Sequence, residues 1–254
     1  MKKYSLLLLV TLSNLAFADL GPTRANTGKI DVKEGKNYRL DGDLSYLLNS
    51  TKSNGESNKK QNLAANLLFQ RQAGVWGQEL RAEAVSANDD GSSGTNVERY
   101  MLSGKALHRS SDSIYQFAKL QGDKDLSSKF DYQISLTAGI GMDILKDEKQ
   151  NLTGEVGAGY RYSKERFAPH DDFNEAIGTV GLYYLYKFNE RVNFNQDLSY
   201  EFGDKAQILR SRSSVSASLT DSISGLVSYQ IKDTQADVGN NRDSLLSVGV
   251  RYTH

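Results

Sequence analysis

Histidine is the side chain best suited to acid–base catalysis near neutral pH, and this chain has three. His108 falls at an expected strand end and His254 is the last residue, whereas His170 is followed by Asp171 and Asp172. A carboxylate that orients an imidazole is one half of a hydrolase triad. No local pattern marks a serine nucleophile, and an acidic segment with one histidine is ordinarily a solvated loop. We therefore predict no catalytic residues and keep a hydrolase site near His170 as the alternative.

Metal and cofactor chemistry finds no support in the residue types. The chain has no cysteine, and its histidines and carboxylates lack metal-ligand spacing. The glycines of 139–141 and 157–159 fall within expected strands, where they permit bending or inward space instead of forming a phosphate loop. Thirty-one basic residues balance 31 acidic ones, which argues against a nucleic-acid partner. We predict no metal, cofactor or nucleic acid.

Many charged residues alternate with apolar ones along the chain, and the charges carry both signs. A period of two is typical of β-strands, whose successive side chains point to opposite faces. The charged candidates for the lining of a barrel lumen are Arg39, Asp41, Asp43, Glu79, Arg81, Glu83, Arg99, Lys105, Glu155, Arg161, Asp197, Glu201, Arg212 and Arg251. Two interpretations stay open: a screened polar channel, or an internal salt-bridge network that holds the wall.

The opposite face of these strands is apolar. The pattern repeats as about twelve strands of about ten residues, the length that a tilted strand needs to cross a bilayer. The expected lipid-facing residues are Leu136, Ile140, Val156, Val180, Leu182, Leu198, Val248 and Val250. A charge there would cost roughly 2–4 kcal/mol at mid-bilayer, which explains its absence. Residues 113–121 are the least clear, and we expect Tyr115 and Phe117 on the apolar face.

The first residues form an export signal. Lys2 and Lys3 precede a short apolar core, and Ala16-Phe17-Ala18 offers a cleavage site, so residues 1–18 are predicted to be a signal peptide. Residues 19–36 are polar and are interpreted as a periplasmic lead-in, and residues 37–254 as the barrel domain. No later run of apolar residues is long enough for a spanning helix.

The connections between strands alternate in length. Segments 72–74, 109–112, 189–191 and 221–222 are short, whereas 50–60, 87–97, 122–130, 163–173 and 233–241 are longer and polar; 203–206 is a short exception. Short turns on the periplasmic side and long loops outside are typical of outer-membrane barrels. We therefore predict a Gram-negative outer-membrane location, with short turns and the C-terminus periplasmic and long loops extracellular.

Aromatic residues gather near both ends of the expected strands, as amphipathic rings do at membrane interfaces. The predicted belt residues are Tyr38, Trp76, Tyr132, Tyr162, Phe188, Tyr200 and Tyr252. An open sheet in lipid would leave edge N–H and C=O groups unpaired, so the strands must close. We predict an all-β fold, a closed antiparallel up-and-down transmembrane β-barrel. Twelve strands give a radius of roughly 12 Å, which allows a narrow lumen or a plugged one.

Several segments resemble one family. Residues 132–141, 157–162, 194–200, 219–222 and 247–252 resemble recurring segments of the YdiY-like putative salt-induced outer membrane proteins. The resemblance implies an uncharacterised outer-membrane barrel, linked to osmotic or salt stress, with no catalytic residues. From it we expect a non-enzymatic barrel, either a narrow porin-like pore for small solutes or a structural envelope protein. Its expected partners are outer-membrane lipid and, during insertion, the barrel-assembly machinery. A barrel hydrolase and a soluble periplasmic β-protein are the alternatives.

Overall fold

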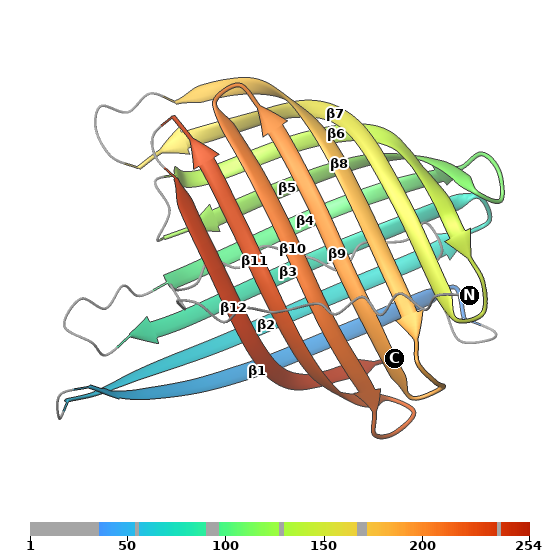
Figure 1. Cartoon of the computed structure of the whole chain (residues 1–254). Coiled ribbons are helices and arrows are strands. Elements are labelled where there is room, and N and C mark those ends of the chain that lie inside the picture. The colour runs from blue at the N-terminus through green and yellow to red at the C-terminus, as the bar shows by residue number, and fades with distance from the viewer. Residues whose placement is uncertain (1–35, 54–55, 90–96, 127–129, 167–171, 238–239) are drawn as a thin grey trace, which may run out of the picture.

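Twelve strands run through the computed structural model, which describes residues 36–53, 56–89, 97–126, 130–166, 172–237 and 240–254 (Figure 1). The predicted signal peptide and residues 19–35 of the lead-in lie outside this range. The strands are β1 (Tyr38–Ser53), β2 (Glu56–Ala73), β3 (Trp76–Asp89), β4 (Val97–Arg109), β5 (Ile114–Asp125), β6 (Phe130–Lys146), β7 (Gln150–Glu165), β8 (Phe173–Lys187), β9 (Val192–Gly203), β10 (Ala206–Ser218), β11 (Ile223–Ala236) and β12 (Asn241–Thr253).

The strands form one closed antiparallel barrel, as the alternating pattern predicts. Each strand pairs with the next along the chain, and β1 pairs with β12. At the β1–β12 seam, the Leu40 N–H donates to the His254 carbonyl at 3.1 Å and the His254 N–H donates to the Leu40 carbonyl at 2.9 Å. Closure therefore leaves no free edge strand among the described residues.

Alternate side chains face opposite sides of the wall. On β4, Met101 is 4% exposed and its neighbour Leu102 is 66% exposed. The same alternation of buried and exposed side chains repeats around the barrel. Charged and hydroxyl side chains lie on the buried side, and large aliphatic side chains lie on the exposed side. None of the described residues forms a helix long and apolar enough to cross a membrane.

Four turns at one end of the barrel share one local structure. They begin at Ser111, Asp147, Asn189 and Thr220, whose side-chain oxygens each accept the backbone N–H groups of the residues two and three positions later. Short side chains of this kind favour turns because they replace a backbone acceptor. These turns are on the predicted periplasmic side, where the C-terminus of the chain also lies (Figure 1).

The Asp147 turn shows how such a carboxylate responds to its donors. The Gln150 side chain and the backbone N–H groups of Lys149 and Gln150 lower the pKa of Asp147 by stabilising its charged form. A lowered folded-state pKa contributes stability above the unfolded pKa of about 3.9, and this contribution is lost as the pH falls through the folded value. The turn is therefore insensitive to pH near neutrality.

The barrel closes over a buried ion pair. Arg251 on β12 donates from Nε to Asp43 Oδ1 at 2.6 Å and from Nη2 to Asp43 Oδ2 at 2.8 Å. Asp43 and Arg251 are also directly opposite in the β1–β12 register. Arg212 of β10 approaches the same carboxylate at 3.6 Å. One carboxylate on the first strand thus lies close to two guanidinium groups from the last part of the chain.

We predict that Asp43→Asn weakens the seam strongly. Removing the charge leaves two buried guanidinium groups poorly compensated, so the free energy of unfolding should fall by about 3–5 kcal/mol. Urea unfolding of the refolded barrel in detergent measures this change. The control is Lys205→Gln, which breaks the Lys205–Asp237 pair. Both side chains of this pair are more than half exposed. The loss of the pair should therefore lower the free energy of unfolding by at most about 1 kcal/mol. Equal effects of the two substitutions would contradict the role of the seam.

Candidate functional site in the barrel interior

The fourteen charged residues that the sequence suggests for the lumen all lie on the inner side of the wall. Twelve of them are buried, and Arg39 and Glu201 are half-buried. They do not form one ring. Instead, the structure brings most of them into local groups of opposite charge. The alternation also predicts Arg210 and Lys232 on this face, both are buried, and the structure adds the buried Glu175.

The first group lies at the seam. Beside the Asp43–Arg251 pair, Arg39 Nε contacts the Asp41 carboxylate at 3.0 Å, and Thr253 Oγ1 donates to Asp41 Oδ1 at 2.8 Å. The Thr253 contact ties β12 to β1 near the turn end, whereas the Arg39 contact lies within β1. Each of the two carboxylates, Asp41 and Asp43, therefore has a partner of opposite charge.

The second group joins β7, β8, β9 and β10. Arg161 Nη2 donates to Glu175 Oε1 at 2.7 Å and to the Ala206 carbonyl at 2.6 Å, while its Nη1 donates to Glu201 Oε2 at 3.2 Å. Glu201 also pairs with Arg210. Glu175 Oε2 accepts the Lys205 N–H at 2.8 Å, so the short β9–β10 connection is fixed to the interior.

The third group crosses the middle of the barrel. Lys105 of β4 forms an ion pair with Glu155 of β7, reaching over β5 and β6. Tyr115 Oη donates to Glu155 Oε1 at 2.6 Å, and Tyr183 Oη donates to Glu155 Oε2 at 3.4 Å. The Lys105 ammonium also lies 4.6 Å from the centre of the Phe117 ring. One carboxylate thus gathers side chains from β4, β5 and β8.

Tyr115 and Phe117 correct the prediction for β5, because both rings lie inside the barrel and are buried. The outward face of the strand is instead Ile114, Gln116, Ala118 and Leu120. The physical reason is the neighbouring strand: Tyr115 is opposite Gly141 and Phe117 is opposite Gly139. A Cβ on Gly139 would come 2.8 Å from Phe117 Cζ, and a Cβ on Gly141 would overlap the Tyr115 ring.

Inward glycines on three strands make a recess that these rings fill. Gly157 of β7 faces the Phe117 ring, and Gly181 of β8 faces the Tyr183 hydroxyl. Sequence reasoning assigned inward space to the glycines of 139–141 and 157–159, and the structure gives the reason for that space. Sequence reasoning did not identify the side chains that fill this space, which are Tyr115, Phe117 and Tyr183. We define these three residues as the aromatic plug.

Two small cavities lie between inward side chains of the described residues. The cavity beside Phe117, Lys119, Tyr183 and Glu201 measures about 50 Å³. A second cavity, beside Asp43, Glu83 and Arg212, measures about 20 Å³. A space of roughly 10–15 Å³ on this measure can hold a water molecule, so both cavities have room for water.

The outer wall has the opposite character. The eight residues predicted to face lipid are all exposed: Leu136, Ile140, Val156, Val180, Leu182, Leu198, Val248 and Val250. At the turn end, the ring centres of Trp76 and His108 are 4.7 Å apart, and those of Phe188 and Tyr186 are 5.1 Å apart. At the other end, Tyr132 and Tyr162 are 5.8 Å apart. Tyr38, Tyr200 and Tyr252 also lie near strand ends on this face.

The histidines separate into two settings. His108 Nδ1 is 3.4 Å from the Gln116 amide oxygen, and His254 Nε2 is 3.0 Å from Lys36 Nζ. His108 therefore lies on the outer wall, and His254 lies at the β1–β12 seam. His170 and Asp171, the alternative hydrolase pair, lie outside the described residues.

A closed antiparallel barrel with an apolar outer wall and a charged, packed interior defines the membrane-barrel class. The chain belongs to the family described as "Protein of unknown function, DUF481", which matches residues 42–254. This match confirms the resemblance to the YdiY-like proteins.

Solved structures show the same fold. An outer membrane channel from Pseudomonas putida F1 is 11% identical and has a TM-score of 0.53, over 92% of this chain and 99% of that one. The translocator domain of the autotransporter NalP from Neisseria meningitidis is 11% identical and has a TM-score of 0.50, over 86% of this chain and 89% of the other. None of the curated proteins matches the chain in sequence.

We predict that Gly141→Val destabilises the barrel because its side chain would overlap Tyr115. Overpacking of this kind costs about 1–3 kcal/mol. The same substitution in a Tyr115→Ala background should cost clearly less, because the ring that it meets is gone. Urea unfolding in detergent measures both values. The control is Gly42→Val, since a Cβ at Gly42 meets nothing within 4 Å. Equal costs of Gly141→Val in both backgrounds would exclude the proposed contact.

Proposed function

We propose that the mature chain is a non-enzymatic outer-membrane barrel that seals its own lumen and serves as a structural protein of the envelope. The observation that carries this proposal is the combination of an apolar outer wall with a mid-barrel interior in which the buried aromatic plug packs against the Lys105–Glu155 pair. Several charged groups inside are paired across strands, among them Arg251–Asp43, Arg161–Glu175 and Lys105–Glu155, so they brace the wall. The fold alone does not choose a function, since a channel and a translocator domain share it.

The proposed orientation places the short turns and the C-terminus in the periplasm and the long connections outside. Support comes from the four turns beginning at Ser111, Asp147, Asn189 and Thr220, which all lie at one end. Short periplasmic turns are typical of bacterial outer-membrane barrels. We also propose the setting that the family resemblance implies, osmotic or salt stress. A sealed barrel fits this setting because it adds protein to the membrane without adding a path for ions.

A narrow pore is the second candidate, and one feature favours it. Among the residues that the structure describes, the obstruction at mid-barrel is made by side chains, the aromatic plug of Tyr115, Phe117 and Tyr183, and not by a segment of backbone. Rotation of these rings would connect polar surfaces on either side of them. Because the interior charges have both signs and are paired, such a path would be weakly selective for ion charge.

We predict that the wild-type barrel is silent in planar bilayers and that Phe117→Ala combined with Tyr183→Ala produces discrete conductance steps. The two substitutions remove the rings and keep Glu155 paired with Lys105 and Tyr115. The matched control is Phe202→Ala, an aromatic residue on the outer wall, which should stay silent. Steady openings of the wild-type protein would overturn the sealed barrel and support the pore.

A further inference from the structure

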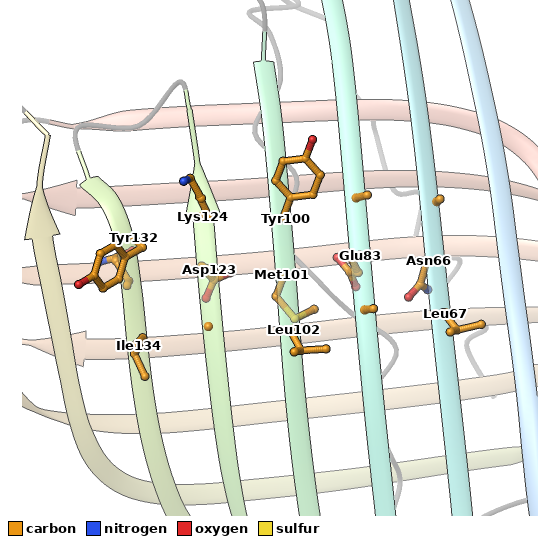
Figure 2. Close-up of a pocket in the computed structure, with 15 residues that line it drawn as sticks. Asn66, Leu67, Glu83, Tyr100, Met101, Leu102, Asp123, Lys124, Tyr132 and Ile134 are labelled. Carbon is orange, nitrogen blue, oxygen red and sulfur yellow. The ribbon is translucent and has the colours of Figure 1, made fainter.

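A hollow lies on the outer wall of the part of the barrel that the structure describes. It measures about 710 Å³ and extends over β2 to β6, on the side that faces away from the lumen (Figure 2). Its floor is made by small residues, Ala65, Ala82, Ala84 and Gly122. Leu67, Leu102 and Ile134 stand around this floor and are exposed. We call this hollow the wall groove; its volume lies in the range of small-ligand sites, roughly 300–1,000 Å³.

One end of the wall groove carries a row of alternating aromatic and basic residues. Tyr100 is opposite Lys124 across β4 and β5, and Tyr132 is opposite Lys164 across β6 and β7. The β5–β6 ladder extends to Asp123 and Gln133, so Lys124 follows on beside Tyr132. Figure 2 shows Tyr100, Lys124 and Tyr132 at one end of the groove and Leu67, Leu102 and Ile134 farther along it.

The two lysines lie on the strands that flank Tyr132, Lys124 on β5 and Lys164 on β7. The Lys164 ammonium lies 5.8 Å from the centre of the Tyr132 ring. Within the described ranges, neither Lys124 nor Lys164 forms an ion pair, whereas the nearby acid Asp131 lies 3.8 Å from Arg166 and Asp172 accepts the Tyr162 hydroxyl at 2.9 Å. Glu98 is a further exposed acid at this end of β4. Lys124 lines the end of the groove, and Lys164 lies beyond Tyr132 on β7, so two ammonium groups stand near one end of the apolar surface.

We propose that the wall groove binds one anionic membrane lipid, with an acyl chain over Ala82 and its phosphate held by Lys124 and Lys164. The groove is apolar along its length and basic at its end, which matches the two parts of such a lipid. Lysines near a membrane surface attract anionic headgroups. The inference rests on the proposed membrane placement and is independent of whether the lumen conducts.

A second copy of the barrel fits the groove less well. Two barrels related by a two-fold axis along the membrane normal keep their residues at equal depth. Contact through the groove would therefore place the Lys124 and Lys164 row of one copy against the same row of the other. Like charges so juxtaposed oppose association.

The test uses the refolded full-length mature chain in detergent and native mass spectrometry. The probes are dimyristoyl phosphatidylglycerol and dimyristoyl phosphatidylcholine, which share acyl chains and differ in headgroup charge. We expect one retained phosphatidylglycerol and much weaker retention of phosphatidylcholine. Lys124→Gln and Lys164→Gln should each weaken phosphatidylglycerol binding about fivefold, and the double substitution about 30-fold.

Two further variants separate the parts of the site. Ala82→Phe fills the groove and keeps both lysines, so it should also reduce phosphatidylglycerol retention. Lys146→Gln removes an exposed lysine at the opposite end of β6 and should leave retention unchanged. Heat-modifiable gel mobility verifies that each variant has closed its barrel.

The outcomes distinguish this inference from the proposed membrane placement. Equal retention of the two lipids, retention unaffected by the double lysine substitution, or a dimer of barrels in place of a lipid adduct would each overturn the lipid site and leave the membrane barrel intact. A mature chain that stays monomeric in buffer without detergent would overturn both.

Discussion

Backbone hydrogen bonding in a medium without water is the constraint on which the rest of this structure depends. Each unpaired N–H or C=O group in hydrocarbon costs several kcal/mol, so a sheet placed there must close on itself. The chain meets this constraint at the β1–β12 seam, where the first and last strands pair and Asp43 meets Arg251. Closure in turn gives every strand two environments, and the period of two in the sequence reflects them.

The two environments explain why the fold could be predicted from the sequence. A strand that exposes alternate side chains to lipid excludes charge from those positions, so the pattern is visible in segments such as 132–142 and 246–252. Turn chemistry is local too, because Ser111, Asp147, Asn189 and Thr220 accept N–H groups two and three residues later. Strand number, antiparallel order and closure all followed from such short-range signals, and the family match agrees with the resemblance seen in the segments.

The interior could be predicted only in part, because its contacts depend on distant strands. Both faces of β5 carry large apolar residues, with Ile114 and Leu120 on one and Tyr115 and Phe117 on the other. What decides between them is the space above Gly139 and Gly141 on β6. The inward position of the charged residues could be read from alternation, whereas their partners could not, since Lys105 on β4 reaches Glu155 on β7. Packing across the barrel, and not propensity along a strand, selects these pairs.

Polar and apolar surfaces have therefore exchanged the places that they take in a water-soluble protein. The charges are inside and balanced in local groups, the aromatic plug fills a glycine recess between them, and the aliphatic residues are outside. Basic residues on the outer wall, such as Lys124 and Lys164, stand at the end of the apolar band. This distribution is stable only if hydrocarbon covers the outer wall.

Fluorescence quenching at single engineered cysteines tests that claim most directly, because the chain contains no cysteine of its own. A polarity-sensitive fluorophore is attached at Leu136 or Val180, with Glu190 in a turn as the control, and the barrel is reconstituted into vesicles. The account predicts that lipid-borne quenchers reach the probes at Leu136 and Val180 and that aqueous iodide reaches only the probe at Glu190. Iodide quenching at Leu136 and Val180 as strong as at Glu190 would contradict it.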